Sequence, residues 1–168
     1  MDLYVLRHAI AVPHGTEGYE RDSDRPLTPR GARKMERIAR GMKRLGVDID
    51  VLLTSPFPRA LQTAEIVHRV LKLKSDLVLT PHLAVGGDQE DLIREIMDNH
   101  SARGSVMICG HEPSLSELIA VLLSGKPDMH VTMKKGGLCR LSVSQLVYGR
   151  SAVLEWMLPP RVLTRVAR

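Results

Sequence analysis

The sequence predicts an α/β fold: a three-layer α/β/α sandwich around a mostly parallel sheet with an antiparallel edge strand. Short apolar runs alternate with longer segments of helical period, which is typical of parallel strands joined by helices. Near the end of the chain this alternation gives way to two successive strand-like runs. At 168 residues the chain is expected to form one domain over 1–168, large enough to bury roughly 70% of its unfolded surface.

The first strand is predicted over 3–6, a run of apolar residues. Residues 9–27 are rich in Gly, Pro and charge without periodicity, so we expect a long loop over the strand tips. Thr28 is a good N-cap, Pro29 a good first helical residue and Gly46 a good helix end. Apolar residues recur at helical spacing between them, which predicts the first helix.

The next strand is predicted over 51–54, and Pro58 opens a second amphipathic helix. A short strand is predicted over 77–79. The turn and cap at 86–88 introduce a third helix, which we expect to end near Asn99.

A further buried strand is predicted over 105–109, followed by a helix that starts near Ser114 and closes at Gly125. The runs 138–143 and 152–157 are strand-like and predict a closing hairpin. The remaining tail carries too little pattern for a prediction.

The net charge is +5 and the calculated pI is 9.5, yet aromatic residues make up only 3% of the chain. So few aromatic side chains disfavour stacking on single-stranded nucleic acid, and no nucleic-acid-binding signature is present, so we expect no nucleic-acid partner. Many basic residues lie on one predicted helix face, which is commonly just solvated but can also attract an acidic partner. They are Arg30, Arg33, Lys34, Arg37, Arg40, Lys43 and Arg44.

Cys109 and Cys139 lie in apolar strand-like runs without metal-ligand spacing, so they are expected to be core residues. No apolar stretch approaches the length that spans a bilayer, and the chain begins directly with a strand. We therefore expect a soluble cytoplasmic protein with no membrane partner.

Two predicted strands each deliver a histidine to their C-terminal ends. Arg7 and His8 follow the first strand, and His111 follows the strand that ends at Cys109. Ligands of open α/β sheets bind at this edge, so the two histidines are expected to meet there. Arg59 lies just inside a helix start, where free N–H groups also favour an anion. This set predicts a phosphoryl-dianion site with one imidazole available for attack. A metal centre lacks a third ligand at a recognisable spacing, so no metal and no cofactor are expected.

These residues belong to a longer ordered pattern that resembles the histidine phosphatase superfamily, the phosphoglycerate-mutase-like fold. The pattern extends from the first strand to about residue 125, and the short length and the segment 22–28 are most similar to the SixA-type phosphohistidine phosphatases. Its pieces are Arg7-His8, Leu27-Thr28-Pro29-Arg30-Gly31, Ser55-Pro56, Arg59-Ala60, Gln62-Thr63 and Gly110-His111.

The resemblance implies that His8 is the nucleophile and carries the phosphoryl group as a covalent intermediate. Its attacking nitrogen must be unprotonated. Neighbouring guanidinium groups would disfavour the imidazolium, and a hydrogen bond to the other ring nitrogen would fix the tautomer. Arg7 and Arg59 are expected to clamp the phosphate with bidentate hydrogen bonds.

His111 is expected to hydrogen-bond the transferring group, most usefully as a cation. The resemblance also places Ser55 and Arg25 among the phosphate-binding residues, although a solvated loop arginine is the alternative for Arg25. Asp22 aligns with the carboxylate of SixA-type enzymes and is the expected proton donor to the leaving group. Asp24 and Glu17 in the same loop are the alternatives.

Two features modify the family pattern. Ala9 follows the nucleophile where the superfamily usually has glycine. The short interval between Arg59 and His111 leaves no room for the lid insertion of phosphoglycerate mutases, so we expect an open pocket that suits a phosphate on a protein side chain.

The expected activity is therefore metal-independent hydrolysis of phosphohistidine on a protein involved in signal transduction, for example a histidine-containing phosphotransfer domain. The alternatives are a phosphatase for small phosphorylated metabolites and a low-turnover phosphate-sensing or protein-binding module.

Overall fold

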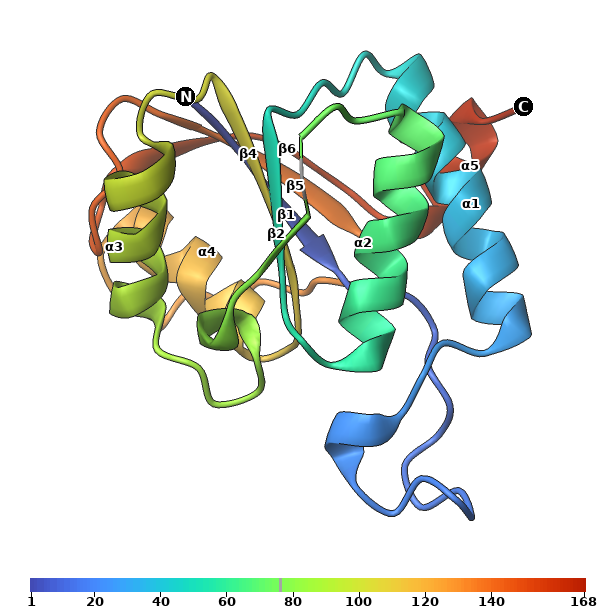
Figure 1. Ribbon diagram of the computed structural model, residues 1–168. Helices are drawn as coiled ribbons and strands as arrows, with labels where there is room; N and C mark the ends of the chain where they lie inside the picture. Colours follow the sequence, from blue (N-terminus) through green and yellow to red (C-terminus); the bar gives the residue numbers. More distant parts are fainter. Residues whose placement is uncertain (76) are drawn as a thin grey trace.

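The computed structural model describes residues 1–75 and 77–168, and it shows a six-stranded open sheet between two layers of helices (Figure 1). The predicted α/β sandwich is confirmed. The strands are β1 (Asp2–Arg7), β2 (Val51–Thr54), β3 (Leu77–Leu79), β4 (Ser105–Gly110), β5 (Leu138–Val143) and β6 (Ala152–Leu158). The helices are η1 (Asp22–Asp24), α1 (Pro29–Arg44), α2 (Pro58–Leu71), η2 (Pro81–Leu83), α3 (Gln89–His100), α4 (Ser114–Ser124) and α5 (Pro160–Val166).

The strand order is β3-β2-β4-β1-β5-β6, and the first four strands of this order are parallel. The predicted antiparallel edge is a hairpin in which β5 runs antiparallel to β1 and β6 antiparallel to β5. β1 and β4 are direct neighbours, with Arg7 opposite Gly110 at their C-terminal ends. The residues that follow these two strands are therefore adjacent in space.

Alternate residues of each central strand face opposite layers, as the strand period requires. Leu3 and Val5 of β1 belong to the core beneath α3 and α4, whereas Tyr4 and Leu6 belong to the core beneath α1, α2 and α5. The central strands are buried on both faces, which explains why they are apolar without alternation. Helices that leave β1 and β4 thus cover opposite faces, which opens a crevice beyond the ends of these strands.

The predicted helix ends are confirmed. The Thr28 hydroxyl accepts a hydrogen bond from the Gly31 amide at 2.9 Å, with Pro29 at the first helical position of α1. Asp88 caps α3 by accepting from the Glu90 amide at 2.8 Å. Gly125 ends α4 with a φ of 87°, a left-handed conformation that favours glycine.

Three short helices were not predicted from the sequence: η1, η2 and α5. α5 packs against α1 so closely that a Cβ on Gly41 would lie 2.1 Å from the carbonyl oxygen of Leu163. Its position therefore depends on a long-range contact rather than on a periodic pattern of its own. No helix in the described part of the chain is long and apolar enough to cross a membrane.

Cys109 and Cys139 are fully buried and unbridged. Burial raises the pKa of both thiols to about 12, so they are inert core residues, as the sequence predicts.

Candidate active site

The candidate site lies at the C-terminal edge of the sheet, where β1, β4 and β2 end side by side. The backbone amide of His8 donates to the Gly110 carbonyl at 3.1 Å, and that of Ser55 donates to the Cys109 carbonyl at 3.0 Å. These bonds continue the sheet one residue past each strand. They bring His8, His111 and Ser55 together, as the sequence predicts.

His8 is 5% exposed, and its Nδ1 lies 2.7 Å from the carbonyl oxygen of Ala9. Because a carbonyl oxygen can only accept, Nδ1 carries the proton and Nε2 is left with its lone pair. The pKa of His8 is lowered to about 3, chiefly by burial. We expected neighbouring arginines to be the main reason that the ring is neutral. Burial is the main reason instead, and the charges of His111, Arg59 and Arg7 lower the pKa further by smaller amounts.

Thr63 connects the segment that follows His8 to the helix that carries Arg59. Its hydroxyl donates to the Arg59 carbonyl at 2.6 Å and accepts from the Ala9 amide at 3.0 Å. The hydroxyl therefore acts as both donor and acceptor, and these two hydrogen bonds fix the first turn of α2 relative to His8.

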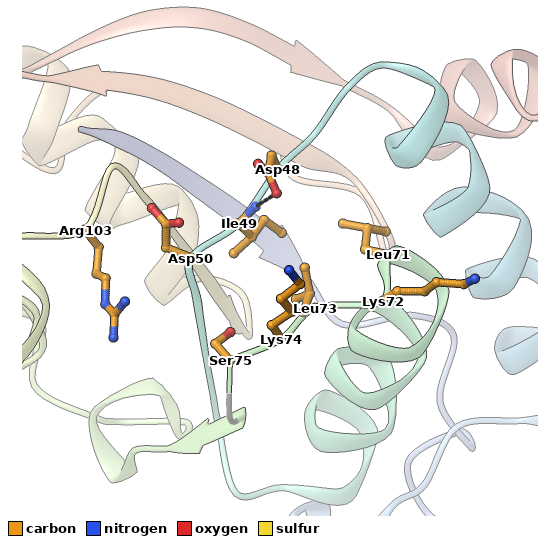
Figure 2. A pocket seen from close by; sticks show the side chains of 9 residues that line it. All are labelled: Asp48, Ile49, Asp50, Leu71, Lys72, Leu73, Lys74, Ser75 and Arg103. Atoms are coloured by element: carbon orange, nitrogen blue, oxygen red, sulfur yellow. Dashed lines mark hydrogen bonds between the residues drawn. The ribbon is translucent and has the colours of Figure 1, made fainter.

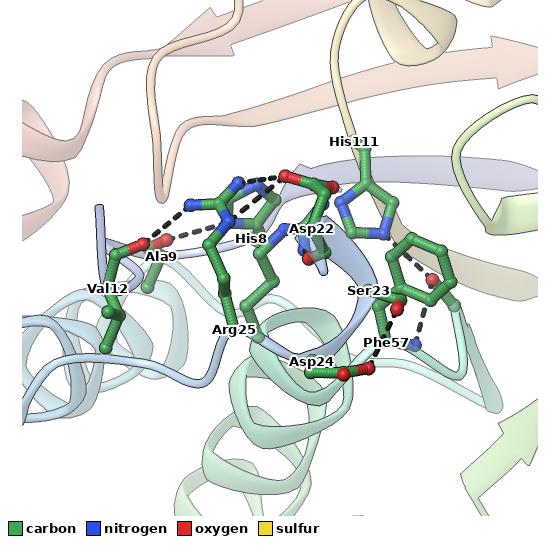
Figure 3. Close-up of polar contacts among 11 residues, drawn as sticks. His8, Ala9, Val12, Asp22, Ser23, Asp24, Arg25, Phe57 and His111 are labelled. Atoms are coloured by element: carbon green, nitrogen blue, oxygen red, sulfur yellow. Dashed lines mark hydrogen bonds and ion pairs between the residues drawn. The ribbon is translucent and has the colours of Figure 1, made fainter. Parts of the chain in front are cut away.

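Arg59 is 2% exposed and is engaged by Asp22. Its Nη2 donates to Oδ2 of Asp22 at 2.7 Å, and its Nη1 donates to the Asp22 carbonyl oxygen. The other carboxylate oxygen accepts from Nε of Arg25 at 3.0 Å (Figure 3). Arg25 also donates to the Val12 carbonyl at 2.6 Å, and its side chain is only 14% exposed. The alternative of a solvated loop arginine is therefore wrong.

The carboxylate of Asp22 is held as an anion. Partial burial acts to raise its pKa, but the hydrogen bonds from Arg25 and Arg59 outweigh burial and leave the pKa below its ordinary value. The structure thus brings Asp22 into the site, although in a form that must gain a proton before it can donate one. Asp24 and Glu17 are exposed. Asp24 accepts from the Ser23 hydroxyl at 2.8 Å and points away from His8 (Figure 3).

Arg7 is held by the segment that precedes β5. Its Nη1 donates to the Met133 carbonyl at 2.7 Å, while its buried Nε has no partner among the described residues. The Gly136 amide lies 3.0 Å from the Arg7 carbonyl oxygen and 3.2 Å from that of His8. Gly136 has a φ of 77°, which a side chain would strain, so this loop approaches Arg7 and His8 because residue 136 is glycine.

Lys135 is a site residue that the sequence reasoning missed. It immediately precedes Gly136 and is exposed. Its pKa is lowered by partial burial and then by the positive charges of Arg7, Arg25 and Arg59. The only signal in the sequence was a basic pair before two glycines, which has no specific meaning without the fold. Lys135 adds a fourth cationic side chain to the site.

His111 is 3% exposed and forms a hydrogen bond of 2.8 Å between its Nε2 and the Ser55 hydroxyl. Its Nδ1 is buried without a partner in the described structure, and its ring lies beside Asp22 (Figure 3). The pKa of His111 is lowered to about 4, chiefly by burial and next by Arg59. The imidazole is therefore neutral in the free protein, and an anion bound beside it would favour its charged form.

Phe57 is a second residue that the sequence reasoning missed. Its ring centroid lies 5.3 Å from that of His111, and the guanidinium carbon of Arg59 lies 5.3 Å from the same ring. Phe57 therefore packs between two site residues and restricts the rotamers of both. The centroids of His8 and His111 are themselves 5.1 Å apart.

Glu112 follows His111 and supports the start of α4. Its Oε2 accepts from the Ser116 hydroxyl at 2.6 Å. Burial raises its pKa, whereas the Ser116 hydrogen bond and the positive charge of Arg7 act in the opposite direction.

The chain belongs to the histidine phosphatase superfamily. Residues 3–84 match the sequence model of the histidine phosphatase superfamily (branch 1). Within this superfamily the chain is a SixA-like phosphatase. It is 33% identical over 135 residues to phosphohistidine phosphatase SixA of Escherichia coli, an alignment that covers 79% of this chain and 81% of that protein.

Solved structures agree with this assignment. A protein histidine phosphatase SixA complexed with tungstate superposes with a TM-score of 0.81 at 28% identity, covering 97% of this chain and 99% of that one. The fold extends to more distant enzymes. A putative α-ribazole-5′-phosphate phosphatase of Escherichia coli gives a TM-score of 0.69 at 18% identity, covering 95% and 97% of the two chains.

Proposed function

We propose that the protein hydrolyses phosphohistidine on a protein substrate through a covalent phosphohistidine at His8. The observation that carries this proposal is the tautomer of His8. Its Nδ1–H is directed to the Ala9 carbonyl at 2.7 Å, and its pKa is lowered to about 3, so Nε2 is a nucleophile at neutral pH.

The reaction has two displacements. In the first, the Nε2 lone pair attacks phosphorus while the bond from phosphorus to the substrate imidazole breaks, and the departing imidazole nitrogen takes a proton. In the second, water attacks the phosphorus of phospho-His8 and passes a proton to the carboxylate that protonated the leaving group. The bond from phosphorus to Nε2 breaks, its electron pair returns to the ring nitrogen, and inorganic phosphate leaves. Both transition states spread negative charge over the three peripheral oxygens.

Cationic side chains supply the neutralising charge without a metal ion in this proposal. Arg7, Arg25, Arg59 and Lys135 surround the site, and His111 joins them when a bound dianion raises its pKa. Ser55 orients the imidazole of His111 through the bond to Nε2. The arginines bind phosphate oxygens with a planar fork, which a lysine does not reproduce.

Asp22 serves as the proton donor to the leaving group. A phosphoryl dianion that binds Arg25 and Arg59 takes over the hydrogen bonds that now hold the Asp22 carboxylate. Losing these bonds, and standing next to a dianion, raises the pKa of Asp22 toward protonation. Substrate binding itself thus prepares the acid.

Two observations support a protein-borne phosphate: the similarity to SixA proteins, and the short connection between α2 and β4, whose described residues form β3, η2 and α3 and no lid. The partner class is a phosphorylated protein such as a histidine-containing phosphotransfer domain. We infer that the enzyme acts in cytoplasmic signal transduction. The E. coli and tungstate-bound SixA proteins carry the same activity in their names.

The test is a phosphatase panel in the presence of a chelator. It compares a protein phosphorylated on histidine with sugar phosphates and an aryl phosphate, at matched concentrations. The proposal requires the highest kcat/KM for the phosphohistidine protein and no loss of rate with the chelator. A best rate on a sugar phosphate would favour the metabolite phosphatase, whose fold-level relatives include the α-ribazole-5′-phosphate enzyme. Phosphate binding without turnover would favour a sensing module.

A further inference from the structure

Outside the active site, the exposed side of α1 together with α5 is strongly basic. We call it the α1/α5 basic face. Two adjoining hollows in it have volumes of about 350 and 470 Å³. The basic residues that line them are Arg30, Arg33, Lys34, Arg37, Arg40 and Arg168.

The basic face contains almost no compensating negative charge. Glu36 is the one acidic residue that lines either hollow, and it already pairs with Arg40 at 3.6 Å and Arg69 at 2.9 Å. Arg33, Arg37 and Arg168 are exposed, and none of them forms an ion pair within the described residues. Their positive charges are therefore available to a partner.

The basic face begins next to the active site. The Thr28 amide donates to the Ile10 carbonyl at 3.0 Å, and a Cβ on Gly31 would lie 2.0 Å from the same oxygen. The first turn of α1 is thus pressed against the segment that follows His8. From there the 16 residues of α1 extend about 24 Å along one side of the sheet layer (Figure 1).

The chemistry of this face fits carboxylates on a folded protein. Arginine forks bind carboxylates bidentately, and a rigid helix presents them at fixed spacing. No aromatic residue lines the two hollows, which disfavours stacking on nucleic-acid bases. No large exposed apolar side chain lines them either, so insertion into a lipid surface has no anchor.

We propose that the α1/α5 basic face docks an acidic, Asp- and Glu-rich surface of the phosphoprotein substrate while the phosphate occupies the site at His8. This inference rests on the proposed function and specifies its partner. Because the charges are exposed, they act mainly by steering association, so their effect falls on KM and weakens with added salt. They do not contact the reacting atoms, so kcat for a small substrate is unaffected.

The experiment reverses charge at Arg33, Arg37 and Arg168 in one triple variant, each to Glu. The matched control reverses Lys72, Lys74 and Arg103, which line a separate cavity of about 560 Å³ among the connections that precede β2, β3 and β4 (Figure 2). These strands enter the sheet at this end, opposite the active site. Both variants change the net charge equally.

The substrates are a phosphohistidine protein with an acidic surface and an aryl phosphate. The basic-face variant is expected to lose roughly tenfold or more in kcat/KM on the protein, mostly through KM, and this loss should shrink as salt is raised. Its rate on the aryl phosphate should match wild type, and the control variant should resemble wild type on both substrates.

Several outcomes would overturn the docking proposal. Equal losses in both variants would indicate a general effect of net charge. An equal loss on the aryl phosphate would indicate a disturbed active site. Wild-type binding to duplex DNA or to anionic vesicles that disappears in the basic-face variant would assign this face to those partners. A wild-type enzyme that hydrolyses the aryl phosphate but not the phosphohistidine protein would instead remove the proposed function, and the docking proposal with it.

Discussion

The carboxylate of Asp22 lies 2.7 Å from Nη2 of Arg59, and the same carboxylate pairs with Arg25. In the free protein the proposed acid therefore occupies the guanidinium groups that the substrate phosphate is expected to bind. A phosphate dianion must compete with this carboxylate, and its binding changes the proton affinity of Asp22.

Asp22→Asn separates these two effects. Inorganic phosphate should bind more tightly to the variant, because a neutral amide competes less with the dianion, and titration calorimetry measures this. Hydrolysis of an alkyl phosphate should fall much further than that of phosphohistidine or an aryl phosphate, whose leaving groups need less help. Asp24→Asn is the matched control and should change neither quantity. Equal rate losses on all three substrates with the fold intact would remove Asp22 as the acid.

Arg59→Ala should lower kcat/KM by about 10²- to 10³-fold, the usual cost of losing one preorganised donor to the transition state. Arg59→Lys should remain strongly impaired, because a lysine restores charge but not the planar fork. Arg69→Ala on the same helix provides the control, since Arg69 is exposed and pairs only with Glu36. A lysine variant near the wild-type rate would show that Arg59 contributes only a point charge.

Brief mixing with labelled substrate should place an acid-labile phosphoryl group on His8, detected by mass spectrometry after a mild quench. His8→Ala should lose both the label and turnover, because no other side chain replaces the Nε2 lone pair. His130→Ala, at an exposed position, should retain both. Substantial activity in His8→Ala would refute covalent catalysis at this residue.

Lys135→Ala should weaken phosphate binding modestly, by up to roughly fivefold, because an exposed charge is partly screened by solvent. The effect should decrease with added salt. The neighbouring exposed residue gives the control: Lys134→Ala should bind phosphate as wild type does. Identical affinities for the two variants would place Lys135 outside the site.

Two buried neutral histidines should make stability depend on pH. The pKa values of His8 and His111 are lowered from 6.5 to about 3 and about 4, so between these values and 6.5 the unfolded chain binds more protons than the native one. The contribution of these two histidines to the free energy of unfolding is therefore complete above pH 6.5. It is lost as pH falls, by about 1.4 kcal/mol per pH unit for each histidine. Urea unfolding at pH 7 and pH 5 measures this. His8→Asn should reduce the slope of unfolding free energy against pH.

The sheet and its four long helices follow from the sequence because their signals are local. Apolar runs, the cap at Thr28 and the glycine at 125 each act within a few residues. The same holds for His8 and His111, since a residue that follows a parallel strand must lie at the sheet edge. α5 could not be predicted in this way, because its seven residues are held by the contact of Leu163 with Gly41.

Lys135 and Phe57 show the same limit within the site. Lys135 is positioned by the hydrogen bonds of the next residue to the end of β1, across more than a hundred residues of chain. Phe57 lies at the start of the helix that carries Arg59, but its contact with the His111 ring depends on the segment that follows β4, far along the chain. The partner of Asp22 was also beyond sequence reasoning, because η1 folds over the strand ends without any periodic signal.

The hydrogen bond between His8 Nδ1 and the Ala9 carbonyl also determines the regiochemistry of the proposed intermediate. With Nδ1 shielded by a carbonyl 2.7 Å away, phosphorus can bond only to Nε2, which yields the tele isomer of phosphohistidine and excludes the pros isomer. The N–H that remains on Nδ1 stays bound to Ala9 throughout, so the ring does not need to rotate between phosphorylation and hydrolysis. In the proposed reaction the substrate carries its phosphoryl group on a separate imidazole, so the intermediate on His8 is a single isomer whichever isomer the enzyme receives.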